Sequence, residues 1–228
     1  MRHTHRNAKT GCCQSHFQAR VRAQVEWLLT QSLGLQTSGY KCTTAILLNI
    51  LYWAASRCAS LTAACDNHHN GPGNQAVRDA LRHCLPKYTA VLERWFNQAL
   101  VSELPARLRR KPHRIAIDWH QIPYHGQPLK NASEIRRGQP HSGTTTFHVY
   151  ATACIVEHGQ RFTLALTRVL LKESCIKVLE RLVCQLQSQQ CRIQVLLLDR
   201  QFYSSYVINW LQQQQLPDVI PVSQRGRI

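Results

Sequence analysis

The chain has 228 residues, of which 44% are hydrophobic, and this is enough for one catalytic-sized domain and a smaller helical one. The 28 Lys and Arg residues outnumber the 12 Asp and Glu residues, and the net charge of +16 predicts a polyanionic partner, most commonly nucleic acid. The longest apolar run, residues 45–55, is interrupted by Asn49 and is shorter than the roughly 20 residues of a membrane span, so we expect a buried helix there and no membrane partner.

No secretory signal is visible, because the N-terminal segment is polar and rich in His and Arg. The ten cysteines contain no C-x-x-C pair and form no regular framework. We therefore expect a cytoplasmic protein whose thiols are reduced and mostly fill core positions.

The first half of the chain is predicted to be helical. Residues 1–20 carry Arg and Lys with no acid before Glu26, and they form either a flexible tail or a basic arm along phosphates. Thr43 or Thr44 and Ser60 are suitable N-caps. Apolar residues recur at helical spacing in five segments: residues 17–33, 43–57, 61–66, 75–85 and 88–104.

Two features of this half point to DNA. A short helix, a turn over residues 67–74 and a second helix resemble a helix-turn-helix that presents Arg78 and Arg82, with a plain helical bundle as the alternative. The densest basic cluster directly precedes the next strand and is either a phosphate-binding patch or a solvated face. Its members are Arg107, Arg109, Arg110 and Lys111. Residues 1–111 are therefore predicted to be a helical DNA-binding region.

The second half predicts a mixed sheet with helices packed on it. One apolar strand leads from Arg114 to Asp118 and another, residues 193–198, leads to Asp199, while residues 119–142 predict a long loop. The other predicted elements are strands over residues 144–155, 161–170 and 218–222, a helix after Ser174 and a helix over residues 204–215.

The order of these elements brings two acids together. Three antiparallel strands followed by helix-linked strands make the first and fourth strands neighbours, so Asp118 and Asp199 are expected to lie close at one sheet edge. Taken singly, a strand-terminal Asp is more often a helix cap or a turn former than a catalytic residue.

Four segments resemble insertion-sequence transposases of the DDE type: residues 116–126 (AIDWHQIPYHG), 143–152 (GTTTFHVYAT), 197–204 (LLDRQFYS) and 221–227 (PVSQRGR). The resemblance implies that residues 112–228 form an RNase H-like catalytic domain, an α+β or α/β fold with a mixed sheet and flanking helices. It also implies that Asp118 and Asp199 are the first two carboxylates of a metal-binding triad. Two Mg²⁺ or Mn²⁺ ions are the implied cofactors, because these hard cations prefer carboxylate oxygens.

The same resemblance assigns further roles. Arg200, Arg225 and Arg227 join the DNA-binding residues, and His120 and His125 become candidate phosphate contacts. The implied activity is binding of terminal inverted repeats followed by DNA cleavage and strand transfer. The implied partners are double-stranded DNA, at the transposon ends and the target, and a second protomer in a synaptic homodimer. The implied location is the cytoplasm, on the nucleoid.

Two positions depart from the family pattern. Gln201 lies where similar sequences often have Gly, a residue that tolerates a tight turn. Glu157, Glu173 and Glu180 all precede Asp199, so none lies where the third acid of the triad is expected. We therefore expect a chain that is truncated at its C-terminus and whose catalytic domain is incomplete.

Four alternatives remain open at this stage. The chain is also compatible with a catalytically dead DNA-binding remnant of a transposase, with a related RNase H-like nuclease, and with a basic structural protein. The fourth alternative is a structural zinc site, although the spacing of its candidate ligands matches no familiar zinc module. These ligands are Cys58, Cys65, His68, His69, His83 and Cys84.

Overall fold

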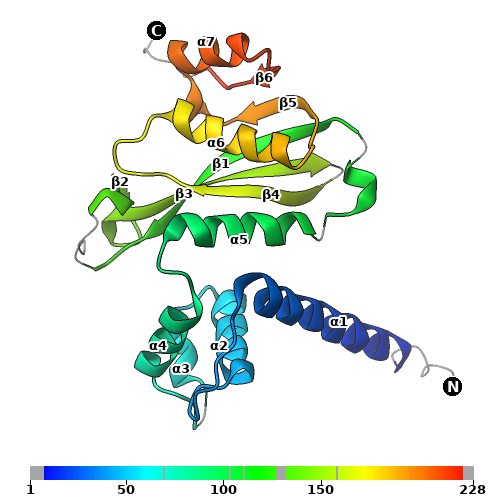
Figure 1. Cartoon of the computed structure of the whole chain (residues 1–228), viewed down its shortest axis with the longest axis vertical. Helices are drawn as coiled ribbons and strands as arrows, with labels where there is room; N and C mark the ends of the chain where they lie inside the picture. The colour runs from blue at the N-terminus through cyan, green and yellow to red at the C-terminus, as the bar shows by residue number, and fades with distance from the viewer. Residues whose placement is uncertain are drawn as a thin grey trace, which may run out of the picture. The chain divides into compact units, whose positions relative to one another are not determined.

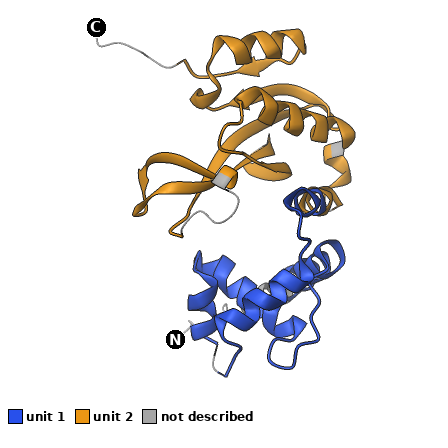
Figure 2. Ribbon diagram, turned by 60° about the vertical axis from the view of Figure 1, so that its left-hand side comes forward, with its two compact units in different colours: residues 1–95 blue, residues 96–228 orange. Residues whose placement is uncertain are grey.

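The structure is a computed structural model that describes residues 8–68, 70–102, 104–109, 111–126, 132–157 and 159–222. The side chains of residues 8–18, Arg109 and Ala132 are also outside the description. Within these ranges the chain is a mixed α/β protein with seven α-helices and one six-stranded sheet (Figure 1). It divides into two compact units, residues 1–95 and 96–228 (Figure 2).

The predicted division at residues 111 and 112 separates a DNA-binding region from a catalytic one, and it stays a prediction. The two compact units divide earlier in the chain, within helix α5 (Thr89–Ser102).

The first unit contains four helices before α5: α1 (Ala8–Leu33), α2 (Thr44–Arg57), α3 (Leu61–Asp66) and α4 (Asn74–Cys84). The predicted caps of α2 and α3 are confirmed. Thr43 Oγ1 accepts a hydrogen bond from Ile46 N at 3.4 Å, and Ser60 Oγ accepts one from Ala63 N at 3.1 Å. A small core joins α2, α3 and α4, formed by Cys42, Leu47, Ile50, Ala64, Cys65 and Val77.

The start of α1 differs from the prediction. The helix was expected to begin at Phe17, but it begins at Ala8, so the expected tail or basic arm is helical in its second part. The stretch from Ala8 to Leu33 contains no proline, and its Ala, Gln and Arg residues favour a helix even where the apolar period is weak. Residues 1–7 lie outside the description.

The second unit is built on a sheet of six strands: β1 (His113–Pro123), β2 (Ile135–His141), β3 (Thr144–Glu157), β4 (Gln160–Arg168), β5 (Ile193–Leu198) and β6 (Asp218–Val219). From one edge to the other, the order is β4-β3-β1-β5-β6. β1, β3 and β4 are mutually antiparallel, whereas β5 runs parallel to β1 and β6 runs parallel to β5. β2 pairs with the outer residues of β3, on the same side of β3 as β4.

Helices α6 (Cys175–Ser188) and α7 (Ser205–Gln213) connect the last three strands. Ser174 Oγ caps α6 by accepting a hydrogen bond from Lys177 N at 3.4 Å, as predicted. The apolar face of α6 lies in the same core as Ile115 and Ile117 of β1. This face consists of Val178, Leu179, Leu182, Val183 and Leu186.

The free edge of β4 is closed by two amide side chains. Asn97 of α5 is buried, accepts a hydrogen bond from Leu166 N at 2.7 Å and donates one to Leu166 O at 3.0 Å. Gln189 donates a third hydrogen bond to Leu164 O at 3.1 Å. An open edge invites pairing with another chain, and these side chains occupy the groups that a further strand would use.

Two predicted elements are wrong in extent: the strand expected over residues 218–222 is limited to Asp218–Val219, and the first strand and the loop after it also differ. The strand expected to end at Asp118 continues to Pro123, and the loop expected over residues 119–142 contains this continuation and β2. Residues 119–123 pair with β3 on one side, and β2 pairs with β3 on the other. Backbone hydrogen bonds to a long central strand hold these segments, and their mostly exposed polar side chains give no apolar pattern. Residues 127–131 lie outside the description.

Candidate functional site

The parallel pairing of β1 and β5 positions the two predicted catalytic acids. The register pairs Ile117 with Leu198, so the next residue on each strand is Asp118 or Asp199. Neighbouring strands are about 5 Å apart, which makes the two acids adjacent at the carboxyl end of β5. The predicted neighbour relation of the first and fourth strands is thereby confirmed.

Asp118 lies within β1 rather than at its end. Ile115 and Ile117 are buried on one face, and the two-residue period of a strand places exposed Asp118 on the opposite face. The carboxylate accepts a hydrogen bond from Trp119 N at 2.8 Å. In the described part of the chain its other oxygen has no hydrogen bond, so it is available to a ligand.

Asp199 follows β5 and is partly buried. Its side chain accepts a hydrogen bond from Arg200 N and so caps the 3₁₀ turn η3 (Arg200–Phe202). The capping role that a strand-terminal Asp commonly has is therefore present here. A cap uses one carboxylate oxygen, and a metal ion can use the other.

An aromatic contact joins the two aspartate segments. Trp119, which follows Asp118, points to the covered face, and its ring meets Phe202 edge to face at 5.7 Å between centroids. Phe202 is fully buried, and the guanidinium of Arg136 lies 4.9 Å from the centre of the Trp119 ring. These contacts fix the backbone on both sides of the acid pair.

The two candidate histidines lie in different places. His120 is on the same face of β1 as Asp118, and its Nε2 is 2.9 Å from Thr152 Oγ1. His125 lies beyond the end of β1, beside the turn at Gly143. With about 3.3 Å per strand residue, it is roughly 20 Å along the chain from Asp118. The structure brings His120 to the acid pair and leaves His125 apart from it.

Sequence reasoning missed Thr152. The antiparallel register places it opposite Asp118 on β3, and its hydroxyl contacts the His120 ring. The two-residue alternation of β3 predicts which of its side chains share a face. The register that selects Thr152 depends on the continuation of β1, which was taken for a loop.

The described members of the basic cluster, Arg107 and Lys111, lie before the start of β1, whereas Asp118 lies in the middle of that strand. Lys111 forms an ion pair with Glu157, and Arg107 donates a hydrogen bond to Gln160 Oε1 at 3.4 Å, so both contact the β3–β4 turn. Seven residues of nearly extended chain, about 23 Å, separate Lys111 from Asp118. Proximity in sequence therefore did not mean proximity in space. The Arg109 side chain and all of Arg110 lie outside the description.

The remaining predicted DNA contacts are on surfaces. Arg78 and Arg82 are exposed on α4 of the first unit, and Arg82 forms an ion pair with Asp79 at 3.0 Å. Arg200 is exposed beside Asp199, and in the described part of the chain its guanidinium makes no hydrogen bond or ion pair. Arg225 and Arg227 fall outside the residues that the structure describes.

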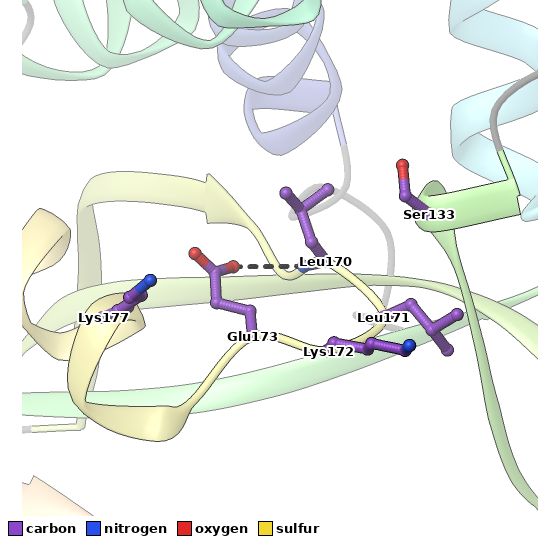
Figure 3. Close-up of a pocket in the computed structure, with 6 residues that line it drawn as sticks. All are labelled: Ser133, Leu170, Leu171, Lys172, Glu173 and Lys177. Atoms are coloured by element: carbon purple, nitrogen blue, oxygen red, sulfur yellow. Dashed lines mark hydrogen bonds between the residues drawn. The ribbon is translucent and has the colours of Figure 1, made fainter.

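A separate cavity of about 420 Å³ lies between the 3₁₀ turn η2 (Ala132–Glu134), the β4–α6 connection and the start of α6 (Figure 3). Its lining consists of Ser133, Leu170, Leu171, Lys172, Glu173 and Lys177, none of which is a predicted site residue. Burial raises the pKa of Glu173, but hydrogen bonds from Arg181 and from Leu170 N outweigh it and hold the pKa below its ordinary value. The carboxylate is therefore ionised and already paired, and it closes the β4–α6 connection.

The donor atoms at the acid pair fit a hard cation in type but not in number. Carboxylate oxygens are the ligands that Mg²⁺ and Mn²⁺ prefer. Among the described side chains, however, no group of three His, Cys, Asp or Glu residues is arranged to hold a metal ion. The same finding gives no support to the zinc alternative in the described ranges, and His69, one of its proposed ligands, lies outside them.

The cysteines depart from expectation. The eight cysteines whose side chains the structure describes are free thiols. Cys42 and Cys65 are buried, and Cys175 and Cys191 pack against the core of the second unit, so half of the eight rather than most of them are core residues. Burial raises the pKa of both buried thiols, which keeps them protonated and unreactive.

Comparison with known proteins does not assign the chain to a family. No protein-family model matches the chain, and no curated protein matches it significantly. Within the described ranges, none of the helices combines the length and the apolar character needed to cross a membrane.

Proposed function

We propose that the chain is a DDE-type transposase that binds the terminal inverted repeats of an insertion sequence and catalyses metal-dependent DNA cleavage and strand transfer. The observation that carries the proposal is the adjacency of Asp118 and Asp199 across the parallel β1–β5 pair. A two-ion phosphodiester site is built from carboxylate ligands, and these two acids would supply the first pair of them. The net charge of +16 supports a nucleic-acid substrate.

The strand order supports an RNase H-like assignment. With β2 set aside, an antiparallel triplet β4-β3-β1 continues into the parallel strands β5 and β6, and α6 and α7 make the connections. This is the arrangement that the sequence resemblance implies. β2 and the outer parts of β1 and β3 add a hairpin to it.

In the proposed mechanism, Asp118 and Asp199 each contribute the carboxylate oxygen that is not bonded to the backbone. Bound Mg²⁺ or Mn²⁺ would activate a water or a 3′-hydroxyl and stabilise the leaving oxygen. Thr152 holds the His120 ring on the face of Asp118, where its second nitrogen can donate to a phosphate oxygen. Arg200 neutralises a phosphate beside Asp199. The family triad requires a third acid in addition to these two.

The proposal includes double-stranded DNA and a second protomer as partners, and a cytoplasmic, nucleoid-associated location. About 20 Å of nearly extended chain separates Lys111 from Asp118, a length spanned by about six base pairs at 3.4 Å each, and Arg107 contacts the β3–β4 turn as Lys111 does. They would therefore contact DNA that flanks the scissile phosphate. Arg78 and Arg82 would contact it through the first unit.

The proposal is tested by Asp118→Asn and Asp199→Asn, which keep side-chain shape and remove charge. The substrate is a supercoiled plasmid that carries the DNA flanking the encoding gene, with Mg²⁺ as the metal. We expect each variant to lose nicking by at least about 100-fold and to bind the DNA as tightly as the parent chain. Asp218→Asn on the neighbouring strand β6 is the matched control and should nick normally.

The alternatives predict other outcomes. A parent chain that binds flanking DNA but never nicks it is a binding remnant, and nicking of unrelated DNA or RNA with equal efficiency indicates a general nuclease. Binding that does not weaken as salt rises contradicts a phosphate-contacting protein altogether.

A further inference from the structure

The segment that follows Asp199 carries two exposed tyrosines between two buried apolar side chains. Phe202 and Val207 are buried at 0% and 2% exposure, and they anchor the segment in the core. Tyr203 and Tyr206 between them are 40% and 78% exposed. In the described part of the chain neither tyrosine hydroxyl forms a hydrogen bond. Buried Phe202 and Val207 therefore anchor the backbone on either side of the tyrosines, whose hydroxyls have no hydrogen-bonding role in the described part of the chain.

Tyr203 lies close to the acid pair, and Tyr206 follows it at the start of α7. Phe202 N donates to Asp199 O at 2.9 Å and Tyr203 N donates to Arg200 O at 3.0 Å, so the chain turns back at this point. The Cα atoms at the two ends of such a turn, here Asp199 and Phe202, are within about 7 Å of each other. One more residue adds at most about 3.8 Å, so the Cα atom of Tyr203 lies within roughly 11 Å of that of Asp199. Tyr206 is in the first turn of α7, whose start is fixed by a hydrogen bond from Val207 N to Ser204 Oγ at 3.3 Å.

We infer that Tyr203 and Tyr206 form a stacking platform for an unpaired DNA base next to the phosphate held at Asp118 and Asp199. The inference rests on the proposed function and narrows its substrate to DNA that is locally unpaired at the reacting end. A base within a duplex has both faces covered by its neighbours, whereas an unpaired base gains by stacking on an exposed aromatic ring. Exposed Arg200 lies between the acid and the rings in sequence, and it supplies a cation for the adjoining phosphate.

The test compares two probes built from the flanking DNA: a blunt duplex, and the same duplex with a three-nucleotide single-stranded overhang that carries 2-aminopurine. Binding is measured by fluorescence anisotropy in EDTA, so that cleavage is not required. We expect the chain to prefer the overhang by roughly 10-fold and to change the 2-aminopurine emission, as base–aromatic stacking does. Tyr206→Ala and Tyr203→Ala should each reduce the preference at least several-fold, while duplex binding changes less than about 2-fold.

Two variants control for other causes. Tyr206→Phe keeps the ring and should keep the preference, and Tyr40→Ala removes a tyrosine that is 97% exposed in the other unit and should change nothing. Equal binding of both probes by the parent chain overturns the platform while leaving the proposed function standing. Failure to bind either probe overturns both. An overhang preference that survives Tyr203→Ala and Tyr206→Ala, or a change of oligomeric state in these variants, assigns the rings to another role.

Discussion

The inner and outer parts of strand β3 differ in what holds them. The inner part lies between β1 and β4 and belongs to the core that α6 completes, with Ala151, Ala153 and Ile155 fully buried. The outer part lies between the end of β1 and β2, where Ile122 is 51% exposed and most of the β2 residues are exposed. Burial stabilises the inner part throughout, whereas in the outer part buried Phe147 and Ile135 are the exceptions and backbone pairing holds the exposed residues around them. Asp118 and Thr152 face each other near the boundary between the two.

If burial governs the stability of the inner part, removal of a buried ring from the core that covers it should have the largest effect on the free energy of unfolding. Phe202→Ala deletes a fully buried ring and its edge-to-face contact with Trp119. We expect a loss of about 3–5 kcal/mol in the free energy of unfolding, measured by urea denaturation. Gln201→Ala, at the exposed neighbouring position, should change it by less than about 0.5 kcal/mol. A loss below about 1 kcal/mol for Phe202→Ala would show that the Trp119–Phe202 contact does not hold the aspartate segments.

Removal of the side chain that closes the β4 edge should have the next largest effect on the free energy of unfolding. Asn97→Ala leaves the backbone N–H and C=O of Leu166 without the partners that they have in the structure. Each unpaired buried group costs about 1–3 kcal/mol, and water entry reduces the sum, so we expect about 2–4 kcal/mol. Hydrogen exchange at the Leu166 amide should become faster, while exchange at Ile117 in the sheet centre should respond only to global stability. Gln98→Ala, on the exposed side of α5, is the control. Unchanged exchange at Leu166 would contradict the closure.

The same comparison explains what the sequence could and could not predict. Helices α2 to α5 and strands β4 and β5 were located to within two residues, and α6 was located by its cap at Ser174, because each is marked by an apolar period, a cap or a turn signal. The adjacency of Asp118 and Asp199 followed from the order of these elements. The outer strand residues were missed because pairing with β3 leaves no mark in the hydrophobic pattern.

Side-chain placement was predictable only where topology fixed it. His120 joined Asp118 because residues two apart on a strand share a face. His125 and Lys111 are close to Asp118 in sequence, yet extended chain carries each of them about 20 Å away. Thr152 is far from Asp118 in sequence and lies opposite it, which only the register reveals.

The packing between β2 and the outer part of β3 can be tested with a substitution whose expected effect is smaller. A Cβ placed on Gly138 of β2 would lie 3.2 Å from the ring of Phe147, which is buried at 1% exposure on β3. We expect Gly138→Ala to cost about 1 kcal/mol in urea denaturation, because the ring or the strand must shift by a few tenths of an ångström. Phe147→Leu alone should also destabilise the chain, since it shrinks a buried side chain. In the double variant the two effects should be less than additive, because the smaller side chain makes room for the new methyl group. Strict additivity would mean that the outer strands adjust independently, and that pairing with β3 does not transmit packing from one strand to the next.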